Sequence, residues 1–173
     1  MNDASSLSPR ALGRRSEAPA AAPEAPQGAP STLLLLTRQI EDEHHAALRD
    51  EPARIIERLA GAHPTLWRPL QQLFGLLHHH LWKEANMLYP AIRLFAAGED
   101  AGGGLVGLVR QARFEHGRML GLIDDLRPQM GLTGEVAPAL WATLERIEAQ
   151  IALEEDQLFP SLLALLGVDE EDL

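Results

Sequence analysis

The stretch that decides the fold is His80-Leu81-Trp82-Lys83-Glu84, followed by Leu88-Tyr89-Pro90. A histidine and a carboxylate four residues apart lie on the same face of a helix. The same spacing returns near the C-terminus, where Gln150-Ile151-Ala152-Leu153-Glu154 is followed by Leu158-Phe159-Pro160. The first residue, the glutamate and the proline keep offsets of zero, four and ten, so the chain contains a degenerate internal repeat.

A histidine lies upstream of each copy of the repeat. Glu43-His44 precedes the first copy and Glu115-His116 precedes the second; His44 stands 36 residues before His80, and His116 stands 34 before Gln150. The repeat unit is therefore a pair of helices. Two such units predict an all-α fold, an up-down four-helix bundle, because each helix offers an inward polar side chain to a metal site at its centre.

Composition narrows the classes of partner. The 173 residues are 46% hydrophobic, and 15 basic against 25 acidic residues give a net charge of −10. This charge repels nucleic acids and anionic lipids, so neither partner is expected. The chain has no cysteine, so any metal must be bound through nitrogen and oxygen. The apolar run Leu33 to Leu36 is too short to span a bilayer, and a cytoplasmic location is expected.

Helix signals divide the chain into three parts. Residues 1–30 are rich in Ala and Pro and predict a disordered tail, residues 31–167 predict the bundle, and residues 168–173 form an acidic tail. Four helices are expected: from Ser31 or Thr32 to Gly61, with a kink or break at Pro52; from near Thr65; after a glycine-rich loop at 98–104, ending before Pro128; and from near Pro138 to Gly167.

Helical periodicity predicts which polar side chains point inward. In the first helix, Ile40, His44 and Ala47 continue the apolar stripe, which places His45 toward the edge. In the other helices the inward polar residues are His80, Glu84, His116, Gln150 and Glu154. Met87 is expected inward as well, whereas His45, His78 and His79 are assigned mostly to the surface.

The inward glutamates indicate a metal. A buried carboxylate needs a counter-charge, and no inward Lys or Arg faces Glu84 or Glu154. Three neutral imidazoles with two carboxylates suit iron, manganese or zinc, and the carboxylates could bridge two ions. A lone inward histidine is more often a hydrogen-bonded core residue, and a lone His-x-x-x-Glu is often a solvated pair. The coincidence of all five within a repeat favours metal binding.

These residues resemble the hemerythrin-like, HHE cation-binding family, and the match covers roughly residues 31–166. Within the family the pattern is similar to the iron-centre repair (RIC-type) di-iron proteins. His44 stands eight residues before Pro52, Ala62-His63-Pro64 places a further histidine ahead of the second helix, and each glutamate is followed by Leu-aromatic-Pro. The resemblance implies His44, His80, Glu84, His116 and Glu154 as ligands of two irons, with both glutamates bridging and His63 as a nearby or alternative ligand.

Two features depart from the family pattern. Gln150 stands where a fourth helical histidine is expected, and an amide oxygen is a weaker ligand for a transition metal than an imidazole. The consequence is a more open iron, a water in the vacant position, a mononuclear site, or a decayed site. The N-terminal tail also lacks the cysteine-bearing domain that the repair proteins often carry.

Three functions remain open at this point. The leading hypothesis is a non-haem iron protein of the nitric oxide or oxidative stress response, which binds a diatomic ligand (NO or O2) or peroxide, or exchanges iron with apo iron proteins. The second is a metal-free interaction bundle. The third, an O2-activating oxidase, needs Glu-x-x-His pairs from two helices, and only Glu41 with His44 fits. The pattern favours a metal-binding stress or repair protein over a classical enzyme and leaves the oligomeric state open.

Overall fold

The computed structural model describes residues 29–59, 64–99, 102–132 and 136–169, and no strand occurs among them. Four helical rods follow one another along the chain. The first is α1 (Ala29–Gln39), η1 (Ile40–His45) and α2 (Ala46–Leu48), followed by the separate helix α3 (Glu51–Leu59). The second is α4 (Pro64–Lys83), η2 (Glu84–Leu88) and α5 (Tyr89–Ala96); the third is α6 (Gly102–Leu126), which ends in the 3₁₀ segment η3 (Arg127–Leu132); the fourth is α7 (Ala137–Leu153), η5 (Glu154–Leu158) and α8 (Phe159–Leu166).

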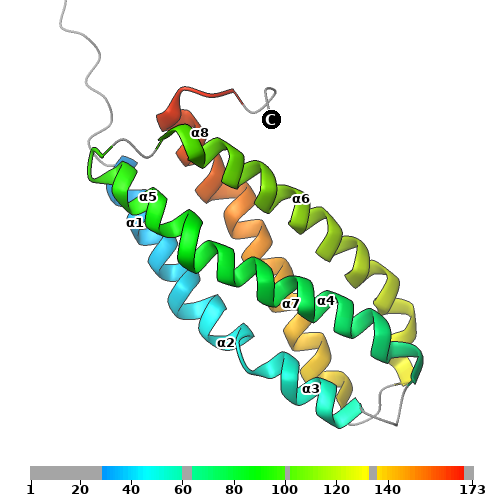
Figure 1. The fold of residues 1–173 in the computed structure, drawn as a ribbon. Helices are drawn as coiled ribbons and strands as arrows, with labels where there is room; N and C mark the ends of the chain where they lie inside the picture. The colour runs from blue at the N-terminus through cyan, green and yellow to red at the C-terminus, as the bar shows by residue number, and fades with distance from the viewer. Residues whose placement is uncertain (1–28, 60–63, 100–101, 133–135, 170–173) are drawn as a thin grey trace, which may run out of the picture.

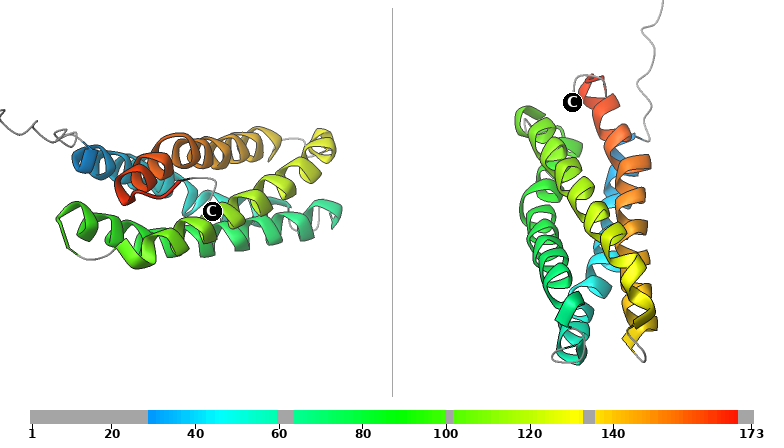
Figure 2. Two further views of the ribbon diagram at one scale, coloured as in Figure 1. Left: turned by 90° about the horizontal axis from the view of Figure 1, so that it is seen from above. Right: turned by 90° about the vertical axis from the view of Figure 1, so that its right-hand side faces the viewer.

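Each rod packs against the next in an up-down bundle (Figure 1). The first rod contacts the second through α1 with α5 and α3 with α4, and it contacts the fourth through α1 with α8 and α3 with α7. The third rod lies between the second and the fourth, because α6 contacts α4, α7 and α8. Figure 2 shows the rods running lengthwise side by side. The prediction of an all-α four-helix bundle is confirmed.

Proline and glycine mark the helix boundaries. Pro52 has no N–H to donate to the carbonyl of Leu48, and the first rod breaks there into α2 and α3. The second rod begins at Pro64, and the first turn of a helix tolerates proline. The fourth ends at Gly167, whose φ of 68° is a left-handed conformation that favours glycine. The loop predicted at 98–104 is shorter than expected, since α6 already begins at Gly102.

The interior consists of two apolar clusters with a polar layer between them. One cluster joins α3, α4, α6 and α7 near one end of the bundle, and the other joins α1, α5, α6 and α8 near the opposite end. The residues buried between them are polar: His45, His80, Glu84, Glu115, His116, Gln150 and Glu154. The apolar clusters therefore shield this layer from water on both sides.

Three of the four rods contain a π-helical turn at the level of the polar layer. The N–H of Ala46 donates to the carbonyl of Glu41, that of Tyr89 to Glu84, and that of Phe159 to Glu154. Each bond spans five residues in place of four, so each turn holds one extra residue. The apolar stripe beyond the turn is consequently displaced by one position.

This displacement corrects two predicted orientations. The expectation that His44 points inward is wrong: His45 is buried and His44 is half-buried, and Leu48 takes the core position expected for Ala47. In the second rod Met87 is 45% exposed and Leu88 is buried in its place. A sequence pattern with a strict period of 3.6 residues does not reveal the extra residue of a π-helical turn.

Some predictions fall on other parts of the chain. Residues 1–28 of the expected N-terminal tail and residues 170–173 of the acidic tail lie outside the described residues, while Ala29 and Pro30 begin α1. Among the described residues, none of the helices combines the length and apolar character needed to cross a bilayer.

The Leu33–Leu36 run provides a test of the helix register. Leu33 is fully buried, whereas Leu35 is 66% exposed on the same turns of α1. Leu33→Ala should lower the free energy of unfolding by about 2–5 kcal/mol, because it leaves a cavity in the core. Leu35→Ala should change it by less than about 0.5 kcal/mol. Urea unfolding of both variants measures the difference, and equal losses would contradict the assigned face of α1.

Candidate metal centre

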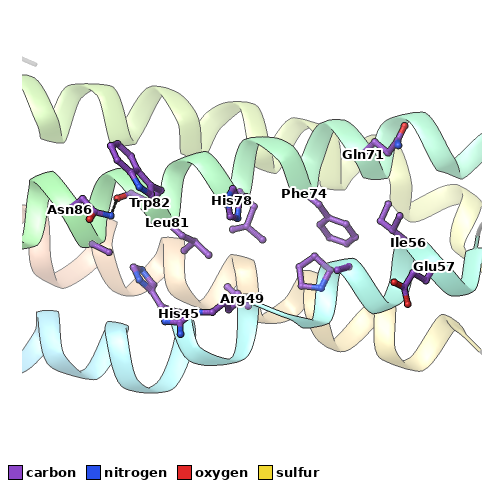
Figure 3. A pocket seen from close by; sticks show the side chains of 15 residues that line it. His45, Arg49, Ile56, Glu57, Gln71, Phe74, His78, Leu81, Trp82 and Asn86 are labelled. Carbon is purple, nitrogen blue, oxygen red and sulfur yellow. Dashed lines mark hydrogen bonds between the residues drawn. The ribbon is translucent and has the colours of Figure 1, made fainter.

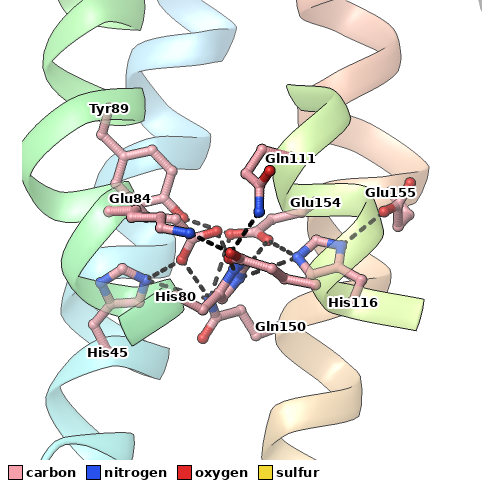
Figure 4. Close-up of polar contacts among 11 residues, drawn as sticks. His45, His80, Glu84, Tyr89, Gln111, His116, Gln150, Glu154 and Glu155 are labelled. Carbon is pink, nitrogen blue, oxygen red and sulfur yellow. Dashed lines mark hydrogen bonds and ion pairs between the residues drawn. The ribbon is translucent and has the colours of Figure 1, made fainter. Parts of the chain in front are cut away.

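Four side chains converge in the polar layer from three rods. His80 comes from α4, Glu84 begins η2, His116 comes from α6 and Glu154 begins η5. One ligand atom from each lies within 4.8 Å of all the others, and all four residues are buried. Figure 4 shows the four side chains pointing toward one another in the space between the rods.

Two histidine–glutamate contacts of equal length meet at the centre. His80 Nε2 lies 3.0 Å from Glu84 Oε1, and His116 Nε2 lies 3.0 Å from Glu154 Oε2. The two contacts are themselves joined, because His80 Nε2 and His116 Nε2 are 3.1 Å apart. His80 Nε2 is also 4.0 Å from Glu154 Oε2. Both imidazoles therefore direct the same kind of atom, Nε2, at one shared space between the carboxylates.

Two further polar residues close one side of this space. His45 Nε2 lies 3.0 Å from Glu84 Oε2. Gln150 donates from Nε2 to the same oxygen over 3.0 Å and to Glu154 Oε1 over 3.4 Å. Gln150 thus faces the cluster, one turn before Glu154, as His80 does before Glu84. Its Oε1 is buried without a hydrogen-bond partner.

A second layer of carboxylates orients the two central histidines. His80 Nδ1 is 3.0 Å from Glu115 Oε2, and His116 Nδ1 is 2.7 Å from Glu155 Oε1. Glu115 also accepts hydrogen bonds from Lys83 and Gln111. A carboxylate on Nδ1 holds the ring in place and keeps Nε2 directed at the centre, which is the usual arrangement behind metal-binding histidines.

Aromatic side chains complete the packing around the cluster. The Tyr89 hydroxyl donates to Glu154 Oε1, and its ring stacks on His45 with centroids 5.5 Å apart. At the equivalent position of the repeat, Phe159 stacks on His116 at 5.8 Å with an angle of 9° between the planes. Tyr89 therefore donates a hydrogen bond across the bundle to a carboxylate, whereas Phe159, which has no hydroxyl group, packs against His116 and Arg113.

Charge separation within the cluster follows from these contacts. Burial lowers the pKa of His80, but the Glu84 and Glu115 carboxylates outweigh burial and raise it to about 10. Burial acts to raise the pKa of Glu84, yet His80 and His45 hold it well below its usual range. Burial and the neighbouring Glu84 raise the pKa of Glu154. In the metal-free chain the buried glutamates are thus compensated by protons on imidazoles, and a cation would have to displace those protons.

Unpartnered atoms indicate that the cluster fits a cation. Glu84 Oε1 and Glu154 Oε2 are buried and form no hydrogen bond, although each lies close to an imidazole nitrogen. Buried oxygens without a hydrogen bond are costly, and a cation between them would satisfy both. The donors are only nitrogen and oxygen, a set that suits iron, manganese or zinc.

The structure brings together most of the residues that sequence reasoning selected. His80, Glu84, His116, Glu154 and Gln150 meet at the centre, and their role as ligands stays a prediction. His44 does not join them, since its place is taken by His45. His63 lies outside the described residues.

Sequence reasoning missed three contributors to the site: His45, Glu155 and Tyr89. The spacing of the repeat contained a signal for His45. His45 precedes His80 by 35 residues, whereas His44 precedes it by 36. The smaller spacing is closer to the 34 residues that separate His116 from Gln150. Sequence reasoning noted Glu115 only as the residue that precedes His116 and did not predict its contact with His80. No periodic pattern marks Glu155, which is 29% exposed and reaches His116 from the adjacent rod.

Comparison with known proteins gives one match, to a family model. No match was found among the curated proteins or among the solved structures. The family model of the hemerythrin HHE cation-binding domain matches residues 37–162. This range covers most of the chain and includes every residue of the buried cluster. The chain therefore belongs to the hemerythrin HHE cation-binding domain family.

Proposed function

We propose that this protein is a non-haem iron protein of the nitric oxide or oxidative stress response, related in role to the iron-centre repair proteins. It would bind two irons per chain, or one if Gln150 does not coordinate. The observation that carries the proposal is the buried cluster of His80, Glu84, His116 and Glu154, whose ligand atoms lie within 4.8 Å of one another in a cation-binding domain.

The residues around the cluster divide into ligands and supports. His80, His116 and His45 would supply nitrogen, and Glu84 and Glu154 would supply negative charge from opposite rods. Glu115 and Glu155 keep the rings of His80 and His116 in place through Nδ1. Iron bound by this set would supply a coordination position for NO, O2 or peroxide and would be open to exchange.

The surroundings suit a small ligand. A cavity of about 20 Å³ adjoins His80, Glu84 and Glu115. This volume is close to the least that holds one water-sized molecule. Larger substrates are excluded on this side by the packed rods, which supports NO, O2 or peroxide as the ligand.

A metal-free interaction bundle is the alternative, and one observation favours it. Gln150 donates hydrogen bonds to both glutamates, and His45 and His80 each lie 3.0 Å from an oxygen of Glu84. The cluster can therefore balance its own charge with protons. An O2-activating oxidase has less support, because Glu41 forms an ion pair with Arg93 and does not reach the cluster.

Iron binding tests the proposal directly. The chain reconstituted anaerobically with Fe(II) should hold about one to two irons after desalting, because the buried carboxylates favour a cation. Elemental analysis measures the stoichiometry. Nitric oxide should then change the visible absorption of the loaded protein but not of the metal-free chain. A chain that refuses Fe(II) supports the interaction bundle, and iron that is indifferent to both nitric oxide and peroxide contradicts the ligand-binding role.

The two adjacent histidines of the first rod make a matched pair for the site. His45→Ala should lower the iron content, because it removes an imidazole that lies 3.0 Å from Glu84. His44→Ala should retain the wild-type content, since it is His45 and not His44 that contacts Glu84. Elemental analysis of both reconstituted variants gives the comparison. Greater iron loss in His44→Ala than in His45→Ala would indicate that His44 points toward the cluster, as simple periodicity predicts.

Gln150 tests the departure from the family pattern. Gln150→His places an imidazole one turn before Glu154, as His80 stands before Glu84. A nitrogen ligand binds iron more strongly than an amide oxygen, so release of iron to a chelator should slow by roughly tenfold. Stopped-flow measurement with a coloured chelator gives the rate, and Gln157→His, on an exposed position beyond Glu154, serves as control. Equal release rates in wild type and Gln150→His would show that residue 150 does not contact the metal.

A further inference from the structure

A groove outside the cluster lies between the first and second rods. It encloses about 680 Å³ between the α2–α3 segment and α4, and one end reaches His45 (Figure 3). Small-molecule sites in proteins commonly measure about 300–1,000 Å³. The groove therefore has the size of a ligand site, and the cation-binding role of the family does not account for it.

The groove results from the break in the first rod. Pro52 prevents α2 from continuing, and α3 resumes after two residues that belong to neither helix. Two small side chains, Ala53 and Ala85, line the groove and are exposed, so they leave its space open. Trp82 at its edge is 53% exposed, which is unusual for so large an apolar side chain.

The two halves of the groove differ in chemistry. In the half farther from His45, Ile56 and Phe74 supply apolar walls, and Glu57 and Gln71 lie at its end (Figure 3). In the half nearer His45, Arg49 and His78 lie on opposite walls (Figure 3). Within the part of the chain that the structure describes, neither Arg49 nor His78 forms a hydrogen bond or an ion pair. A guanidinium and an imidazole without partners are suited to an anion.

We propose that this groove binds a small organic carboxylate with an apolar body. The carboxylate lies between Arg49 and His78, and the apolar body lies against Pro52, Ile56 and Phe74. The proposal does not rest on iron, because none of these five residues belongs to the cluster.

Charge and length constrain the occupant further. Glu57 and Gln71 lie at the far end of the groove, where a second carboxylate would be repelled by Glu57. The ligand is therefore a monocarboxylate with its charge at the His45 end. Gln71 and His78 are seven positions apart, which corresponds to about 10 Å along α4 and suits a body of medium length such as that of octanoate.

Binding of octanoate to the full chain tests the inference. Isothermal titration calorimetry of the metal-free and the Fe(II)-loaded protein should show one site for octanoate. Octan-1-ol, which has the same body without the charge, should bind about tenfold more weakly, and acetate should not bind detectably. The net charge of −10 disfavours anions elsewhere on the surface, so a single site is expected.

Exposed positions supply the variants and their matched controls. Arg49→Gln should weaken octanoate binding about tenfold and His78→Gln should weaken it less, whereas Arg58→Gln and His79→Gln, which do not line the groove, should bind as wild type does. Ala53→Phe should abolish binding by filling the groove while circular dichroism stays unchanged. The proposal is overturned if octanoate does not bind, if octan-1-ol binds equally well, or if Arg49→Gln has no effect. Loss of iron binding alone would leave these results unchanged and would count only against the proposed iron function.

Discussion

The burial of two carboxylates in the middle of the bundle is the constraint on which the rest of the site depends. Glu84 and Glu154 are almost completely withdrawn from solvent, and desolvating such charges costs several kcal/mol each even after relaxation. The bundle meets this cost with imidazoles. His80 and His45 face Glu84, and His116 faces Glu154 at 3.0 Å. A second layer of carboxylates, Glu115 and Glu155, then anchors the central rings. The polar layer is therefore built around Glu84 and Glu154, the two residues whose burial costs the most free energy.

The π-helical turns make this arrangement possible within an otherwise regular bundle. Glu84 and Glu154 are the first residues of their turns, and each turn adds a residue where the polar layer meets the apolar cluster beyond it. The apolar stripe can then resume on the correct face after the glutamate. In the first rod the corresponding turn brings His45, and not His44, to the cluster. Such turns often occur at functional sites, and here all three lie at the level of the candidate metal centre.

The cluster is closely packed on most sides, but one of its histidines also lines a surface groove. The two apolar clusters shield it along the bundle axis, and a cavity of about 20 Å³ adjoins His80 and Glu84. His45 is different, because it also lines the groove that the break at Pro52 opens. One histidine thus belongs both to the buried polar layer and to a surface groove. A ligand in the groove would lie beside the cluster without entering it.

The sequence by itself determined the fold and most of the candidate site. The repeat of His80-x-x-x-Glu84 in Gln150-x-x-x-Glu154 predicted helix pairs, a bundle and four inward residues, because positions four apart share a helical face whatever surrounds them. Only the tertiary structure decided between His44 and His45, since a π-helical turn changes the register by one residue and leaves no trace in a regular period. It also decided the roles of Glu155 and Tyr89, which reach the cluster from neighbouring rods. Contacts between side chains distant in sequence depend on how the rods pack, and no pattern within one helix records that packing.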